Sequence, residues 1–269
     1  MAEQRKKKQS QNGAERKPMQ PADTSADAGK AAADTRPGVL RNKASLTLQT
    51  THAQRLVQGR EGAGGKQPII GLDGLARYAA QISNSAAAGD PYADLALLSV
   101  EGLLADTQKM IRNLIGEISD VLDSVPAVEV ELAQSVVPVH VPLMFATPYG
   151  FLGAYLLADY DELVRTVMTA RHCAFIDRNR AFGHLLRTGR PIRRLFCLGP
   201  TVWRYTGVTR EDIAKNTKLA QQAKVVYANM NIHDIPADVL QGSRRGRYAP
   251  PIRQTPATSA ASYLEEDGE

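Results

Sequence analysis

Residues 43–60 read KASLTLQTTHAQRLVQGR. The first part alternates apolar and polar residues, which is the pattern of a half-buried β-strand. Leucines form its apolar side, at Leu46 and Leu48. Hydrogen-bonding side chains form the other side, at Ser45, Thr47 and Gln49. This polar side is either a solvated face or a surface that contacts a ligand.

A helix is predicted directly after this strand. It covers His52–Arg60, and Thr50 or Thr51 is its candidate N-cap. Leu72–Ser83 is a second short helix, after a flexible loop at 60–68. The local order is strand, helix, helix, which is the order of a ribbon-helix-helix unit. In such units two chains pair their strands, and the ribbon enters the major groove of DNA.

The rest of the folded chain is helix-rich. Ala93–Ser124 carries a long apolar stripe, and Pro126 ends it. Val128–Phe145 alternates and is predicted as strand, with Pro138 and Pro142 indicating an edge. Further helices are expected at 148–178 with a break near Asp159, at 180–188, at 210–227 and at 236–240. These elements predict a mostly α (α+β) single domain.

Length and composition limit the class of protein. The chain has 269 residues, a net charge of +5 and two well-separated cysteines, Cys173 and Cys197. This cysteine usage favours a reducing compartment over a disulfide scaffold. No apolar run reaches the ~18 residues of a membrane span, and the N-terminus lacks a secretory pattern. We therefore expect a cytoplasmic protein that makes no membrane contact.

Two tails flank the expected domain. Residues 1–38 contain almost no large apolar side chains and begin with the basic run QRKKKQ, which predicts a disordered basic tail. Residues 253–269 predict a disordered acidic tail. The folded domain is then 39–252.

Motifs for catalysis are absent from the sequence. The loop GAGGK at 62–66 lacks the first glycine and the final hydroxyl residue of a phosphate-binding loop. The five histidines have no metal-ligand spacing, and His172 adjoins Cys173 without converging on it. Glu129 and Glu131 share the solvated side of a predicted strand. We expect no enzyme, no metal, no cofactor and no small-molecule substrate.

Arginines dominate the charge pattern between 171 and 204. They are Arg171, Arg178, Arg180, Arg187, Arg190, Arg193, Arg194 and Arg204, with Asp177 as the one acid among them. The arginine fork matches phosphate oxygens, so one interpretation is a phosphate-contacting face. The other interpretation pairs these arginines internally with Asp159, Asp161 and Glu162. A second cluster lies at Arg244, Arg245 and Arg247.

Several segments resemble the AcaB-like transcriptional regulators. They include SLTLQTTHAQRLVQGR at 45–60, IIGL at 69–72, DPYADLALLSVE at 90–101 and SVVPVHVPLMFATPYGFLGAYLLADYDELVRTVMTARH at 135–172. The likeness continues with RRLFCLGPTVWRYTGVTRED at 193–212 and IPADVLQGSRRGRYAPPI at 235–252. It covers nearly all of 39–252, in order. This family is carried on conjugative plasmids and integrating elements, and its characterised member is described as a ribbon-helix-helix activator of transfer genes.

The resemblance implies a DNA-binding transcriptional regulator of transfer genes that acts on double-stranded DNA as a homodimer. The candidate DNA-binding residues are Lys43, Ser45, Thr47, Gln49, Arg187, Arg190, Arg193 and Arg194. Residues 136–145 offer a second candidate strand, but acids near its following helix favour 43–50. The alternative function is a non-enzymatic accessory protein of element transfer or maintenance, whose arginine face docks an acidic protein.

Overall fold

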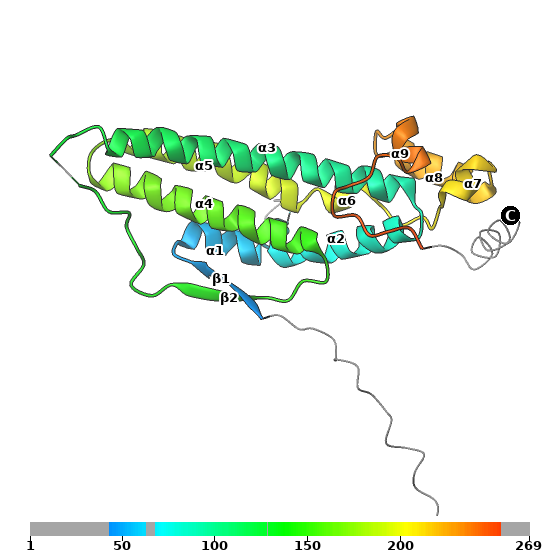
Figure 1. The fold of residues 1–269 in the computed structure, drawn as a ribbon, viewed down its shortest axis with the longest axis horizontal. Helices are drawn as coiled ribbons and strands as arrows, with labels where there is room; N and C mark the ends of the chain where they lie inside the picture. Colours follow the sequence, from blue (N-terminus) through cyan, green and yellow to red (C-terminus); the bar gives the residue numbers. More distant parts are fainter. Residues whose placement is uncertain (1–42, 63–67, 128, 254–269) are drawn as a thin grey trace, which may run out of the picture. The chain divides into compact units, whose positions relative to one another are not determined.

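Four long helices run side by side and enclose the hydrophobic core (Figure 1). The structure, a computed structural model, describes residues 43–62, 68–127 and 129–253. The helices are α1 (Thr51–Gln58), α2 (Leu72–Ala87), α3 (Pro91–Leu122), α4 (Pro148–His172), α5 (Arg178–Phe196), α6 (Gly199–Val202), α7 (Arg210–Ala214), α8 (Lys218–Ala228) and α9 (Ala237–Gln241). The strands are β1 (Ala44–Leu48) and β2 (Val139–Leu143). The helix-rich prediction with a small amount of strand is confirmed.

The tails predicted at 1–38 and 253–269 lie outside the described residues, except for Arg253. The Arg253 backbone N–H donates to the carbonyl of Ala87 at the end of α2.

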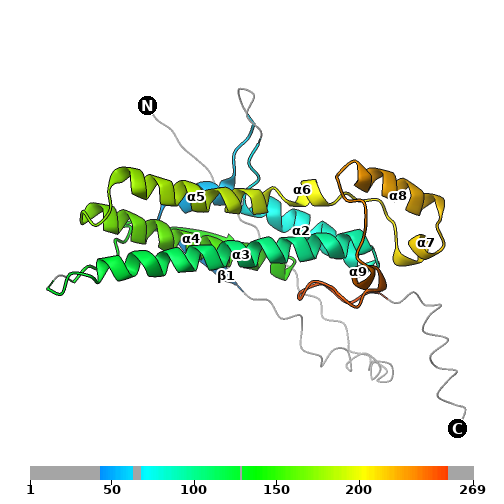
Figure 2. The same cartoon turned by 90° about the horizontal axis from the view of Figure 1, so that it is seen from above.

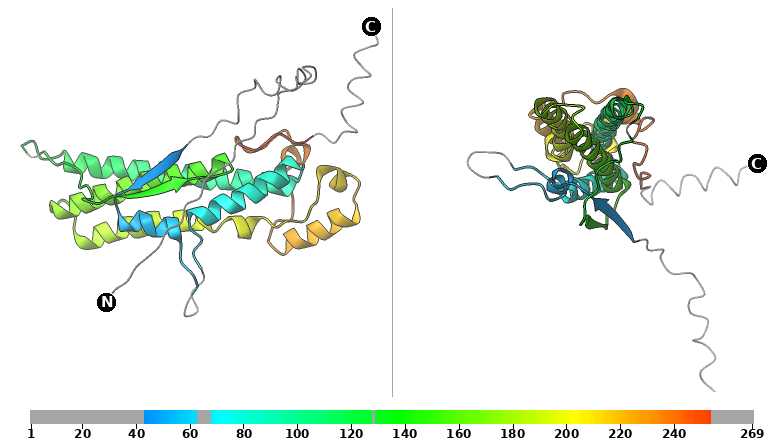
Figure 3. Two further views of the ribbon diagram at one scale, coloured as in Figure 1. Left: turned by 90° about the horizontal axis from the view of Figure 1, so that it is seen from below. Right: turned by 90° about the vertical axis from the view of Figure 1, so that its left-hand side faces the viewer.

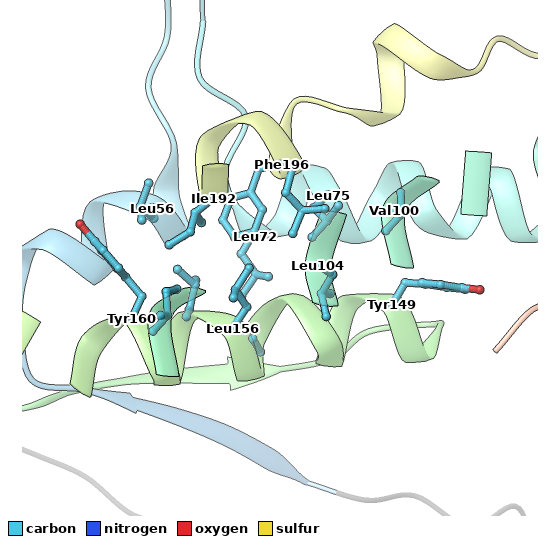
Figure 4. Packing of buried hydrophobic residues seen from close by; sticks show 14 of the residues in the cluster. Leu56, Leu72, Leu75, Val100, Leu104, Tyr149, Leu156, Tyr160, Ile192 and Phe196 are labelled. Atoms are coloured by element: carbon cyan, nitrogen blue, oxygen red, sulfur yellow. The ribbon is translucent and has the colours of Figure 1, made fainter. Parts of the chain in front are cut away.

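The core forms where the apolar stripes of α2, α3, α4 and α5 meet. Figure 4 shows Leu75 from α2, Leu104 from α3, Leu156 from α4 and Phe196 from α5 converging on one interior. The stripe predicted for α3 is buried along its length, from Leu97 to Leu122. Amphipathic helices of this kind derive most of their stability from packing rather than from local propensity.

The two strands form an antiparallel ribbon that packs on α4. Its register places Leu46 opposite Val141 and Thr47 opposite His140. The ribbon lies on the side of α4 away from α3, as both the front view and the end view show (Figures 1 and 3). Leu46 and Leu48 are buried beneath it, so the predicted apolar side faces the core. The partner strand is β2 of the same chain, whereas the sequence led us to expect a second copy.

Hydrogen bonds at the helix starts explain several boundaries. Thr50 is the N-cap of α1, and its hydroxyl accepts the Ala53 N–H. Asp90 caps α3 by accepting the N–H groups of Tyr92 and Ala93. Gly242 closes α9 with a φ of 79°, a conformation that glycine adopts without strain. The Thr50 cap and the Gly242 stop were predicted from the sequence and are confirmed, whereas the Asp90 cap was not predicted, and α3 begins two residues before the expected Ala93.

The short helices α6 to α9 gather at one end of the long helices (Figures 1 and 2). The fully buried carboxylate of Asp94 in α3 ties this end together by pairing with Arg210 and Arg245. Arg244 pairs with Asp238 at the surface. Two members of the second arginine cluster are thus engaged in ion pairs within the chain.

Four predicted elements differ from the structure. The stretch 129–138 is not strand, because its backbone bonds to side chains instead: Ala133 N–H donates to Thr169 and Ser135 N–H donates to Gln49. Helix α4 continues through Asp159 without a break. Helix α5 runs to Phe196, with Pro191 inside it. The helix expected at 210–227 is split into α7 and α8 at Asn216, whose φ is positive.

Candidate nucleic-acid interface

The outer face of the ribbon carries three polar side chains and one proline. Ser45 and Thr47 of β1 and His140 and Pro142 of β2 are exposed, and each pair lies directly opposite in the register. A hydrogen bond of 3.0 Å joins Thr47 Oγ1 to His140 Nδ1. Lys43 is exposed just before β1. The two candidate strands of the sequence therefore form one surface rather than competing surfaces.

Gln49 lies past the end of β1, is half-buried and makes hydrogen bonds within the chain. Its side-chain oxygen accepts the Ser135 N–H at 2.8 Å, and its own N–H donates to Asp161. A bidentate contact with adenine needs both the amide oxygen and the amide nitrogen. One of these two groups, the amide oxygen, is already engaged by the Ser135 N–H.

Asp161 in α4 fixes the junction between β1 and α1. Its carboxylate accepts the Gln49 N–H at 2.8 Å, the Thr50 N–H at 2.9 Å and the Thr50 hydroxyl at 2.6 Å. The Asp161 residue is only 4% exposed, so these bonds form away from bulk water. Hydrogen bonds to a charged acceptor are stronger than neutral ones. We call this contact the Asp161 clamp.

The order strand, helix, helix occurs twice in the chain. The first unit is β1, α1 and α2, and the second is β2, α4 and α5. The two strands of these units pair antiparallel with each other. One chain therefore supplies both strands of a ribbon that separate chains supply in a dimeric ribbon-helix-helix unit.

The arginines of α5 lie away from the ribbon. Arg187, Arg190 and Arg194 are exposed and fall on one helical stripe, spaced by three and four residues. Arg190 and Arg194 line a hollow between α3 and α5, together with Leu103, Asp106, Thr107, Met110 and Pro191. The ribbon packs on α4 instead. The structure thus separates this group, the α5 arginine stripe, from the ribbon face.

Arg193 belongs to neither group. It is half-buried and lines a different pocket, shared with His52 and Arg55 of α1 and Tyr160 of α4. Sequence reasoning did not connect these residues, because they come from three helices that are distant along the chain.

Two of the three acids that could have paired with the arginine run, Asp159 and Asp161, have other partners. Asp159 accepts from Gln108 and pairs with Arg112 of α3, while Asp161 forms the clamp. Within residues 43–62, 68–127 and 129–253, no ion pair involves an arginine between 171 and 204. Internal pairing with these acids is therefore not how the arginine run is used.

Other kinds of site receive no support from the part of the chain that the structure describes. No group of three or more histidine, cysteine or acidic side chains there is placed to hold a metal ion. None of the described helices is long and apolar enough to cross a membrane. Cys173 is exposed, Cys197 is half-buried, and both are free thiols. The glycine-rich loop at 63–67 lies outside the described residues.

The fold and its surface define a helical protein that displays a two-stranded ribbon on one face of α4. The family model described as "Transcriptional regulator AcaB" matches residues 36–253. The chain therefore belongs to the AcaB family. Comparison with curated protein sequences gives no significant match. Among solved structures, the chain is similar to "Crystal structure of selenomethionine-containing AcaB from uropathogenic E. coli". That similarity has a TM-score of 0.49 at 9% identity, covering 76% of this chain and 98% of the other.

Proposed function

We propose that this transcriptional regulator binds double-stranded DNA with the outer face of the β1–β2 ribbon. Its targets in this proposal are transfer genes of the integrating conjugative element or conjugative plasmid that carries it. The observation behind the proposal is that one chain supplies both strands of an antiparallel ribbon with polar outward side chains. The major groove of B-DNA is roughly 12 Å wide and admits a two-stranded ribbon.

Individual contacts follow from the chemistry of the exposed side chains. Ser45 and Thr47 can donate and accept hydrogen bonds at base edges, and the Thr47 methyl suits the methyl group of thymine. His140 is joined to Thr47, so it orients the hydroxyl and adds a polar ring beside it. Lys43 is placed at the edge of the ribbon to meet a phosphate. Gln49 contributes indirectly, by fixing Ser135 at the approach to β2.

The proposal needs no cofactor, and it includes no catalytic step. It places the protein in the cytoplasm, where it meets DNA. In this proposal the homodimer forms on the DNA and the free protein folds as a single chain, because the ribbon is complete within one chain. Two copies would read two half-sites, as many dimeric regulators do on palindromic operators.

A selection experiment tests this function. The purified protein selects duplexes from a random library, and a selected duplex is then titrated beside a scrambled one at a fixed salt concentration. Ser45→Ala with Thr47→Ala should lower affinity for the selected duplex by about tenfold or more, since each base contact is worth about 1–3 kcal/mol. Weak binding to the scrambled duplex should persist, because phosphate contacts supply it.

The matched control is Ser99→Ala with Thr201→Ala, which removes exposed hydroxyls of the same two types from α3 and α6. The control should bind like the wild type. Equal affinity of the ribbon variant and the control for the selected duplex would contradict base reading by the ribbon.

A second candidate function is an accessory protein of element transfer or maintenance. One observation favours it: the α5 arginine stripe is exposed, has no ion pair among the described residues and lies away from the ribbon. Replacing Arg187, Arg190 and Arg194 with glutamine separates the roles. If these arginines contact phosphates, the slope of log DNA affinity against log salt concentration should become shallower by about one unit per lost contact. An unchanged slope would indicate that the α5 arginine stripe does not contact DNA and would favour an acidic protein as its partner.

A further inference from the structure

A positively charged pocket lies between α1, α4 and α5, apart from the outer ribbon face. Its volume is about 360 Å³, which falls within the range of ligand pockets, roughly 300–1,000 Å³. Its lining residues are His52, Arg55, Leu56, Gly59, Arg60, Ile69, Tyr160 and Arg193. Three of these are arginines, and no carboxylate is among the described residues that line the pocket.

Tyr160 forms the inner wall and presents an unpartnered hydroxyl. The residue is only 3% exposed. Figure 4 shows its ring among core residues and its hydroxyl directed outward on the side of Leu56. None of the hydrogen bonds among the described residues uses this hydroxyl, and its oxygen is not one of the fully buried unpaired polar atoms, so it opens into the pocket. A ligand in the pocket would supply a partner for it.

Arg193 brings its guanidinium to the same place. A Cβ atom on Gly189 would lie 3.0 Å from Arg193 Nη1 and 3.2 Å from Tyr160 Oη. Both polar heads therefore lie beside this glycine, which has no side chain to occupy that space. Arg193 has no ion pair within the described part of the chain, and its charge lowers the pKa of Tyr160 against the larger, opposite effect of burial.

The rim of the pocket is fixed by backbone bonds. Arg60 and Ile69 exchange two N–H to carbonyl bonds of 2.7 Å across the base of the 61–68 loop. Gly59 allows this approach, because a Cβ there would lie 2.3 Å from the Ile69 carbonyl oxygen and its φ is 71°. Across the pocket, burial and the charge of Arg55 lower the pKa of His52, in keeping with a positive environment.

We propose that this pocket binds a small phosphomonoester, no larger than a nucleoside monophosphate. An arginine fork offers paired N–H donors to phosphate oxygens, and the Tyr160 hydroxyl adds a third donor from the interior. The pocket is recessed among three helices, which suits a small ligand better than the backbone of a duplex. Asp161 follows Tyr160 directly, so the ligand would lie beside the clamp that holds the β1–α1 junction.

The test uses ribose 5-phosphate, with ribose as the uncharged control, in calorimetric titrations of the full chain at low salt. Saturable binding of ribose 5-phosphate without binding of ribose is the expected result. Tyr160→Phe removes only the hydroxyl and should weaken binding about tenfold, as should Arg193→Gln. Arg187→Gln, an exposed arginine on the same helix but outside the pocket, should bind like the wild type.

Two results would overturn the proposal. One is the absence of saturable binding of both ribose 5-phosphate and inorganic phosphate to the folded wild type. The other is an equal loss in Arg187→Gln and Arg193→Gln, which would indicate general attraction to positive charge. A third outcome combines no binding of ribose 5-phosphate with a weaker salt dependence of duplex binding in Arg193→Gln. In that case the pocket receives a DNA phosphate, and the small-ligand proposal fails.

Discussion

Removing the Asp161 carboxylate should loosen the ribbon more than any change on its exposed face. Asp161→Ala deletes the acceptor of three hydrogen bonds and leaves the Gln49 N–H, the Thr50 N–H and the Thr50 hydroxyl without it. A bond to a charged group contributes about 1.5–3 kcal/mol, and unsatisfied buried donors add to the loss. Because these terms are not additive, we expect the free energy of unfolding to fall by about 3–5 kcal/mol.

Asp161→Asn should have an intermediate effect on the free energy of unfolding. Its single side-chain oxygen can keep both bonds from Thr50, while its NH₂ group would face the Gln49 N–H. The expected loss is about half that of the alanine variant. The matched control is Asp159→Ala, two residues earlier in α4, whose partner Arg112 has a side chain that is 64% exposed. Asp159 also accepts a hydrogen bond from Gln108, so this control removes an ion pair worth at most about 1 kcal/mol and one side-chain hydrogen bond worth about 1 kcal/mol, which is less than the expected loss in Asp161→Ala.

Urea unfolding followed by circular dichroism measures all three variants, and amide exchange at Gln49 and Thr50 locates the effect. Faster exchange at these two amides should accompany the loss of stability in both Asp161 variants. If Asp161→Ala is no less stable than Asp159→Ala, the clamp does not hold the ribbon to α4 and the reasoning is refuted.

Three further predictions concern stability. Burial raises the pKa of Asp90 to about 6, so its contribution to stability is present at low pH and lost as the pH rises through about 6. We compare the unfolding free energies of the wild type and of Asp90→Asn at each pH. The wild-type value minus the variant value should fall by up to about 3 kcal/mol between about pH 4 and pH 7, and a constant difference would contradict this. The melting temperature should not change between about 1 and 100 μM protein, because each chain completes its own ribbon; a rise with concentration would show that folding needs a second copy. Thr209→Ala should cost about 1 kcal/mol in urea unfolding, since Thr209 and Asp212 form a capping box; a loss no larger than that of Thr201→Ala would refute it.

Sequence patterns predicted those helices and strands whose position is set by residues close to them in the sequence. The alternation of leucines with polar residues located β1 and its buried side, and the Thr50 cap located the start of α1. The stripe of α3 and the capping box at Thr209 are similarly short-range signals. Each of these features is set within a few residues of sequence, so a single sequence is enough to find it.

Long-range pairing could not be predicted in the same way. The partner of β1 is β2, which comes after three helices, whereas the sequence led us to expect a second copy of β1. The run at 129–132 does not form a strand, because neither described strand pairs with it. The adjacent Ala133 instead bonds through its backbone to the side chains of Thr169 and Arg165 in α4. Helix α5 was predicted too short because Pro191 normally ends a helix, whereas burial of Ile192 and Phe196 sustains it here.

The candidate site was only partly readable for the same reason. Ser45 and Thr47 lie on an exposed face as expected from the alternation, and His140 joins them only because β2 pairs in register. The role of Gln49 depends on Ser135, and the pocket around Arg193 depends on three helices. None of these contacts leaves a signal in the local sequence.

Photo-crosslinking tests the central claim, that the ribbon face meets DNA, most directly. Benzoylphenylalanine replaces Lys43 at the edge of the ribbon in one protein and Val225 on α8 in another, and each is irradiated with a duplex selected by the wild type. Both positions are exposed, and only the first borders the ribbon. We predict a crosslink to the selected duplex from position 43 and none from position 225. A crosslink from position 225 with none from position 43, in proteins that bind the duplex equally well, would contradict the account.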